Sequence, residues 1–196
     1  MMVDLRVFVQ YLAFAGALLA GLGAQAQGFS AAISPPRFEI ATEPGKTVRQ
    51  VLEITHVSTL PGHYRVSTAA WRLSETGDFQ IFDTLQPGSC RPWVAIERPV
   101  VEMKPGSRLR YRFEVAVPPD TTMGECRFAL LVQSATPDTH SAVPLSGRIA
   151  VVVYLRIGSA KAELKILTAA MTTLEGQSHP GLQIQNTGQA TGRLLG

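Results

Sequence analysis

The sequence predicts an all-β protein: an immunoglobulin-like antiparallel β-sandwich of about seven strands, followed by the start of a second β-domain. Three observations support this fold class. Apolar and polar residues alternate with a period of two in several segments, Pro-Gly pairs separate these segments, and no segment has the pattern of an amphipathic helix.

The clearest strand runs from Leu109 to Val117. Its odd-numbered positions are apolar, whereas Arg108, Arg110 and Arg112 lead the other face. Such alternation is typical of a strand with one face on a core and one in water. We interpret the arginine row as a solvated face, with an acidic partner or lipid head groups as the alternative. Other strands are expected at 29–40, 48–55, 63–73, 79–82, 93–101 and 126–132, with Trp71 packed between the sheets.

Two further strands are predicted after Gly158, at 163–172 and 182–185. Two strands cannot bury a hydrophobic core without further structure. We therefore divide the chain into a signal peptide at 1–26, an immunoglobulin-like domain at 27–160, and the first strands of an incomplete second sandwich domain at 161–196. The stretch 136–147, rich in Pro, Ser and Thr, is predicted to be a long flexible loop before the last strand of the sandwich.

The N-terminus has the features of a cleavable export signal. Arg6 precedes an apolar run from Val7 to Leu22, and small residues ending in Ala24-Gln25-Ala26 follow. This pattern predicts cleavage before Gln27 and export to an oxidising compartment, the bacterial periplasm. A membrane anchor is the alternative, but the run of about 16 residues is shorter than the roughly 20 that a spanning helix needs. We expect no membrane insertion after cleavage.

Cys90 and Cys126 are the two cysteines of the sequence. In an oxidising compartment an even pair is typical of a disulfide. The alternative is two buried free thiols, because a sequence does not give the distance between them. No C-x-x-C motif is present and the four histidines are scattered, so we expect no metal site.

Composition and motifs argue against two other classes of protein. The formal net charge of +3, with 17% charged residues, is too diffuse to indicate nucleic-acid binding. The sequence contains no G-x-S-x-G or H-E-x-x-H motif, and its histidines do not cluster near Ser or Cys. We therefore expect neither an enzyme nor a cofactor.

The segment from 149 to 157 departs from simple alternation because both of its faces are apolar. One row consists of Ile149, Val151, Val153, Leu155 and Ile157. The other row consists of Ala150, Val152 and Tyr154. Either this strand is central and covered on both sides by its own fold, or one row serves the core and the other serves a partner. Donation of a strand to another chain's sheet is a known mode of recognition, in which backbone hydrogen bonds give affinity.

Six short motifs follow one another between Phe29 and Gly158. They are Ile33-Ser34-Pro35-Pro36-Arg37-Phe38, Ala70-Trp71, Lys104-Pro105-Gly106, Pro118-Pro119-Asp120, Cys126-Arg127-Phe128 and Val153-Tyr154-Leu155-Arg156. In this order they resemble the periplasmic chaperones of pilus assembly. The resemblance implies two immunoglobulin-like sandwiches arranged as a boomerang. It also implies that the last strand of the N-terminal domain is lent to pilin subunits, which stay folded until an outer-membrane usher accepts them.

The resemblance also implies roles for particular residues. Ile149, Val151, Val153 and Leu155 would be the donor row that fills the groove of a pilin-like β-subunit. The family anchors the subunit's terminal carboxylate with an Arg near the first strand and a Lys on the donor strand. Arg37 matches the first, with an ordinary surface ion pair as the alternative. Val152 stands at the lysine position, so Arg148 or Arg156 is the candidate substitute.

The favoured hypothesis is a periplasmic chaperone that stabilises pilus subunits by strand donation. Its expected partners are pilin-like β-subunits, an outer-membrane usher and a second copy of the chain in a self-capping homodimer. The alternative is a secreted or cell-envelope immunoglobulin-like binding or structural module without chaperone activity. The two hypotheses differ in whether the apolar strand at 149–157 is within reach of another polypeptide.

Overall fold

The computed structural model of the chain describes residues 29–74, 77–135, 147–174 and 176–194. The predicted signal peptide and nearly all of the predicted loop at 136–147 lie outside these ranges. The described elements are β1 (Ala31–Ser34), β2 (Arg37–Thr42), β3 (Thr47–His56), β4 (Gly62–Leu73), β5 (Phe79–Phe82), the 3₁₀ helix η2 (Arg91–Trp93), β6 (Val94–Ile96), β7 (Val100–Met103), β8 (Arg108–Ala116), β9 (Gly124–Ser134), β10 (Arg148–Ile157), β11 (Leu164–Leu174) and β12 (Gln177–Asn186).

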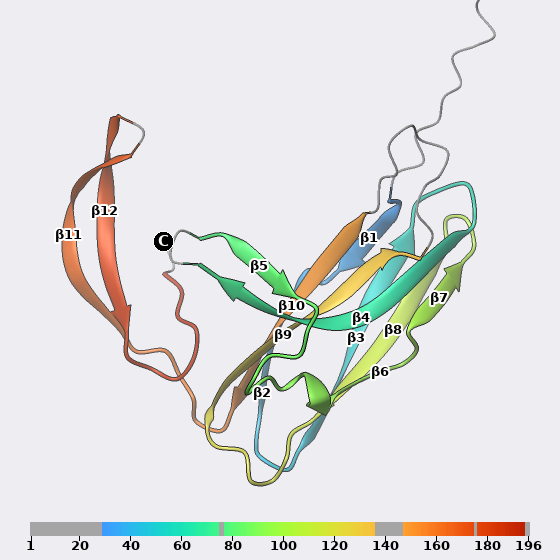
Figure 1. The fold of residues 1–196 in the computed structure, drawn as a ribbon, viewed down its shortest axis with the longest axis horizontal. Helices are drawn as coiled ribbons and strands as arrows, with labels where there is room; N and C mark the ends of the chain where they lie inside the picture. The colour runs from blue at the N-terminus through green and yellow to red at the C-terminus, as the bar shows by residue number, and fades with distance from the viewer. Residues whose placement is uncertain (1–28, 75–76, 136–146, 175, 195–196) are drawn as a thin grey trace, which may run out of the picture.

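Strands β1 to β10 form a sandwich of two sheets (Figure 1). The first sheet has the order β1-β3-β8-β6, and the second has the order β2-β10-β9-β4-β5, with β7 also paired to β4. The predicted all-β immunoglobulin-like sandwich is confirmed. Its neighbouring strands are antiparallel, as predicted, except for one pair: β10 runs parallel to β2, with Val152 beside Arg37 and Ile157 beside Thr42.

Prolines divide two segments that were each predicted as one strand. The segment 29–40 becomes β1, which pairs with β3 in the first sheet, and β2, which pairs with β10 in the second. Pro35 and Pro36 lie between them and lack the N–H groups that a continuous ladder needs. In the same way Pro99 separates β6 in the first sheet from β7 in the second. The chain therefore crosses between the sheets at both places.

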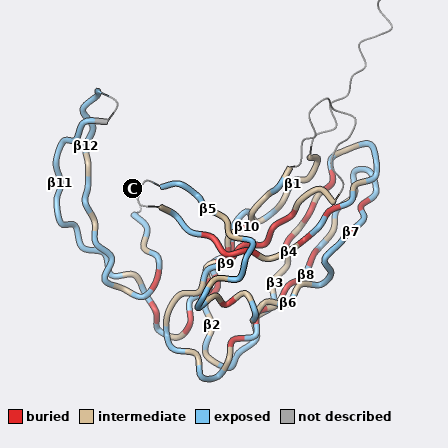
Figure 2. The backbone as a smooth tube through the Cα atoms, in the orientation of Figure 1, coloured by how far each residue is buried: buried red, intermediate tan, exposed pale blue. Residues whose placement is uncertain are grey.

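The main core lies between the two sheets, and Figure 2 shows buried residues concentrated in the sandwich. Alternate residues of the central strands fill it, as the period-two pattern predicts. Its largest fully buried side chains include Leu52, Ile54, Tyr111, Phe128, Leu130 and Leu155.

A second, smaller cluster lies on the outer face of the second sheet. It consists of Ala69, Trp71, Ala129 and Leu131. The prediction that Trp71 packs between the sheets is wrong: its position on β4 has the opposite parity to the core residues Tyr64 and Val66. The indole N–H of Trp71 donates to the carbonyl of Phe128 at 2.9 Å, which satisfies this buried polar group.

A disulfide joins Cys90 and Cys126, whose Cα atoms are 6.2 Å apart. Cys90 immediately precedes η2, and Cys126 lies on β9. The bond therefore ties the connection between β5 and β6 to the second sheet. It closes a loop of 35 residues (126 − 90 − 1), which by loop entropy stabilises the fold by about 3–4 kcal/mol.

Strands β11 and β12 form a separate antiparallel hairpin beside the sandwich (Figure 1). Both predicted strands are present, and β12 is longer than the predicted 182–185. Large apolar side chains remain exposed on this hairpin, among them Ile166, Met171 and Leu182. The division of the chain into domains at residue 160 stays a prediction.

Candidate functional site

Strand β10 has an open edge over part of its length. It pairs with β9 along its full extent, from Arg148 to Ile157. On its other side it pairs with β2 only from Val152 onward. Within the described ranges, Arg148–Val151 therefore has no strand partner on that side. We call this segment the open edge of β10.

The predicted donor row faces the protein's own core. Val151, Val153 and Leu155 are each 0% exposed, and the half-buried Ile149 packs against the same core. In the chain alone, three of the four predicted donor side chains are core residues. Their role in a partner's groove stays a prediction, and it would require these side chains to leave the core.

The opposite row of β10 is half-buried against the smaller cluster. Ala150, Val152 and Tyr154 pack there, and the Tyr154 ring meets the Trp71 ring edge-on with 5.2 Å between centroids. Cover on both faces accounts for the doubly apolar sequence of this strand. What β10 offers to another chain is therefore chiefly the backbone of its open edge, with the half-buried Ile149 beside it.

An open edge presents unpaired backbone N–H and C=O groups, which form a template for pairing with another strand. Proteins usually protect such edges with charged side chains or proline. Here Arg148 stands at the start of the edge, paired with Asp83 at 3.2 Å. The next three positions, Ile149 to Val151, are uncharged and contain no proline. This segment is chemically suited to strand addition.

The two carboxylate-anchor candidates line one hollow at the other end of β10. Its volume is about 350 Å³, and it is lined by Arg37, Glu39, Glu125, Tyr154, Arg156, Thr191 and Arg193. Arg37 lies on β2 directly beside Val152, the residue that follows the open edge. Arg148, the other candidate substitute for the lysine, is not among the lining residues. We call this space the anchor hollow.

Glu39 pairs with two arginines of the anchor hollow. It lies 3.0 Å from Arg37, and Arg193 donates a hydrogen bond to it. The hydrogen bond from Arg193 lowers the pKa of Glu39; partial burial opposes this, and the charges of Arg193, Arg37 and Arg156 reinforce it. Arg156 forms no ion pair with any described residue, so its guanidinium is open to an anion.

The segment after β12 closes one side of the anchor hollow. The backbone N–H of Thr191 donates to Glu125 at 3.0 Å, and the Arg193 guanidinium lies 4.9 Å from the centre of the Tyr154 ring. Sequence reasoning found Arg37 and Arg156 but missed Glu39, Glu125 and Arg193. Strand alternation could have found Glu39, which follows Arg37 by two positions on the same face of β2. No local pattern connects Arg193 to Glu39, because the two are 154 residues apart in the chain.

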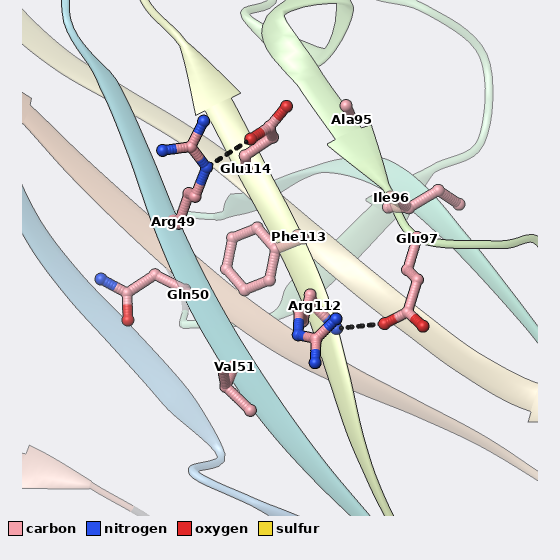
Figure 3. Close-up of a pocket in the computed structure, with 9 residues that line it drawn as sticks. All are labelled: Arg49, Gln50, Val51, Ala95, Ile96, Glu97, Arg112, Phe113 and Glu114. Atoms are coloured by element: carbon pink, nitrogen blue, oxygen red, sulfur yellow. Dashed lines mark hydrogen bonds and ion pairs between the residues drawn. The ribbon is translucent and has the colours of Figure 1, made fainter.

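A second hollow, of about 270 Å³, lies on the first sheet across β8 (Figure 3). Arg49 is paired with Glu114 at 2.9 Å, and the backbone N–H of Arg112 donates to Glu97 at 3.1 Å. The predicted arginine row of β8 is exposed on this sheet, as expected for a solvated face. This hollow and the open edge of β10 belong to different sheets, so we treat them as separate surfaces.

Neither membrane-spanning helices nor metal-binding groups are found in the part of the chain that the structure describes. None of its helices has the length and apolar character needed to cross a membrane. None of its His, Cys, Asp and Glu residues gather in the groups of three or more that could hold a metal ion.

No family model and no curated protein matches this sequence, whereas 138 chains of solved structures match its fold. One belongs to a chaperone–tip adhesin complex of CFA/I fimbriae biogenesis, with a TM-score of 0.54 over 82% of this chain and 68% of that one. Another is the class 5 fimbriae chaperone CfaA, with a TM-score of 0.53 over 81% and 67%. The chain has the fold of the fimbrial chaperones.

A third match is the CsuC–CsuE chaperone–tip adhesion subunit pre-assembly complex from the archaic chaperone-usher Csu pili of Acinetobacter baumannii. Its TM-score is 0.52, over 82% of this chain and 78% of that one. Sequence identity is 12% in all three cases. The resemblance inferred from the six motifs is thus confirmed at the level of the fold.

Proposed function

We propose that this chain is a periplasmic chaperone that binds pilin-like β-subunits by strand addition at the open edge of β10. The observation that carries the proposal is this edge: in a fold shared with fimbrial chaperones, Arg148–Val151 lacks a strand neighbour among the described residues. The predicted signal peptide at 1–26 supports export, and the open edge lies in the predicted sandwich domain at 27–160.

A subunit strand beside the open edge would take the place that β2 occupies further along β10. Backbone hydrogen bonds to Arg148–Val151 would supply affinity, and the half-buried Ile149 would supply an apolar contact. This arrangement keeps Val151 and Val153 in the core, where they hold the edge rigid. In this arrangement, recognition depends mainly on backbone hydrogen bonds. In the predicted donor-row arrangement, it would depend mainly on side chains inserted into the subunit's groove.

The anchor hollow supplies a means of fixing the register of the added strand. A strand that runs parallel to β10, as β2 does, ends near Val152, and Val152 lies beside Arg37. Its terminal carboxylate would then meet Arg37 and the unpaired Arg156. Guanidinium groups bind carboxylates through paired, charge-assisted hydrogen bonds, so this contact would select a chain end over an internal segment.

Two further partners follow from the same proposal. A second copy of the chain can cover the open edge, which gives the self-capping homodimer. The outer-membrane usher, which would receive the chaperone–subunit complex, is proposed from the family resemblance alone.

We also propose that 161–196 belongs to a second β-domain, since its hairpin has exposed apolar side chains that a larger sandwich would cover.

The burial of β10 favours one alternative function. Because Val151, Val153 and Leu155 are fully buried, the same strand would also suit an envelope module that binds no subunit and uses β10 only as a structural element. A purely structural role for β10 would not require an open edge next to an arginine-lined hollow. This combination is the reason that we favour the chaperone.

The experiment is co-expression in a bacterial periplasm with candidate neighbouring small β-proteins, followed by pull-down and mass spectrometry. Ile149→Asp places an unpaired charge on the open edge and should abolish capture of the subunit. Ile96→Asp is the matched control, because Ile96 is also half-buried against the core but lies on β6, at the edge of the first sheet. It should capture the subunit as the wild type does.

The chaperone proposal fails if folded Ile149→Asp retains and stabilises the subunit as well as the wild type does. It also fails if no small β-protein is ever retained by the wild type. Circular dichroism and resistance to proteolysis establish that each variant is folded before the comparison is made.

A further inference from the structure

One carboxylate of the chain itself already occupies the anchor hollow. Oxygen Oε1 of Glu39 lies 3.0 Å from Nη2 of Arg37, and the same oxygen accepts a hydrogen bond from Nη1 of Arg193. The two arginines come from distant parts of the sequence, one on β2 and one on the segment after β12. A single carboxylate oxygen between two guanidinium groups is the arrangement that an incoming carboxylate would also adopt.

The charge balance of the anchor hollow disfavours binding of a second carboxylate while Glu39 stays paired with Arg37 and Arg193. Three arginines face two glutamates there. Glu125 is held by Thr191 and by Arg127, the latter at 3.8 Å. Glu39 holds Arg37 and Arg193, so Arg156 is the remaining cation. A ligand that met Arg156 alone, beside Glu39, would gain one attraction and suffer one repulsion.

We propose that Glu39 is an internal stand-in for the ligand's terminal carboxylate, which must displace it from Arg37 and Arg193 in order to bind. This inference rests on the proposed carboxylate anchor and adds a regulatory element to it. Arg193 becomes a third anion-binding residue, in place of the lysine that Val152 replaces. The Tyr154 ring, 4.9 Å from the Arg193 guanidinium, keeps that group at the hollow when Glu39 leaves.

Competition from Glu39 weakens the apparent affinity for a ligand carboxylate. The apparent Kd equals the intrinsic Kd divided by the fraction of time that Arg37 and Arg193 are free of Glu39. If Glu39 occupies the two arginines for about nine-tenths of the time, its removal tightens carboxylate binding about tenfold. The effect applies to a free carboxylate and not to an amide, because an amide does not replace the negative charge. The proposal therefore predicts a change in discrimination as well as in affinity.

The test uses the whole chain and two synthetic apolar peptides of one alternating sequence. One ends in a free carboxylate and the other in a carboxamide, and binding is followed by fluorescence anisotropy. Glu39→Gln should bind the carboxylate peptide about tenfold more tightly than the wild type, and the amide peptide equally well. Arg193→Gln should weaken the carboxylate peptide selectively. Glu114→Gln, which breaks the Arg49–Glu114 pair on the first sheet, is the control and should change neither affinity.

The outcomes separate this inference from the proposed anchor. If Arg37→Gln abolishes the preference for the carboxylate while Glu39→Gln binds no more tightly than the wild type, the stand-in role is overturned and the anchor remains. If neither the wild type nor Glu39→Gln distinguishes the two peptides, both fail. Glu39→Ala is a second variant for the same comparison, in case the glutamine amide keeps a hydrogen bond to Arg193.

Discussion

The two halves of β10 have nearly the same sequence character but different surroundings. Both alternate apolar side chains, and both pair with β9. The half from Val152 to Ile157 also pairs with β2, whereas the half from Arg148 to Val151 has no such neighbour in the described ranges. The difference lies in another segment: β2 begins at Arg37, immediately after Pro35 and Pro36, where the chain crosses between the sheets.

This comparison shows that an open edge is set by the neighbouring strand and not by the strand that carries it. If β2 began four residues earlier, the ladder would extend along β10 and no edge would be left. The two prolines, which lack N–H groups, place its start at Arg37. The same boundary brings Arg37 next to the end of the open edge, so one local feature positions both parts of the proposed site.

Shortening side chains in the two halves should sharpen the contrast. Leu155→Ala removes a fully buried side chain in the flanked half and should lower the free energy of unfolding by about 3 kcal/mol. Ile149→Ala acts on a half-buried side chain at the open edge and should cost about 1 kcal/mol. Urea denaturation of the purified chain measures both values. Equal losses would mean that the open half is packed as firmly as the flanked half.

A smaller effect is expected from pH at the anchor hollow. The pKa of Glu39 is lowered, chiefly by the hydrogen bond from Arg193. The contacts of Glu39 with Arg193 and Arg37 are therefore complete above the ordinary carboxyl pKa, and they are lost as the pH falls through the lowered value. The segment around Thr191–Arg193 should loosen in acid.

A thiol-reactive spin label at the exposed Gln189→Cys, on the segment after β12, would report this loosening. A label at Ser159→Cys, which precedes the hairpin, is the control and would not report it. The mobility of the label at Gln189→Cys should rise in acid in the wild type and be independent of pH in Glu39→Gln. A wild type with the same pH response as Glu39→Gln would show that Glu39 does not hold the segment.

Much of the sandwich follows from the sequence alone. The alternation at 109–117 predicts β8, and Tyr111, Phe113 and Val115 are buried as that pattern requires. The run at 149–157 predicts β10, including its two apolar faces. These predictions succeed because each depends on a local period that the backbone imposes on neighbouring side chains.

The parts that the sequence does not predict depend on long-range geometry. Alternation in β4 does not say which of its two faces lies against the main core, so the predicted position of Trp71 between the sheets is wrong. Whether β10 is open depends on where β2 starts. The contact of Glu39 with Arg193 joins residues 154 positions apart, and no spacing rule connects them.

Hydrogen exchange of the chain with and without a captured subunit tests the central claim most directly. The backbone amides of Arg148–Val151 that face away from β9 should exchange rapidly in the chain alone and become protected in the complex. The amides of Val152–Ile157, already flanked by β9 and β2, should hardly change. Protection that appears at β6 or on the β11–β12 hairpin, with Arg148–Val151 unchanged, would contradict strand addition at the open edge of β10.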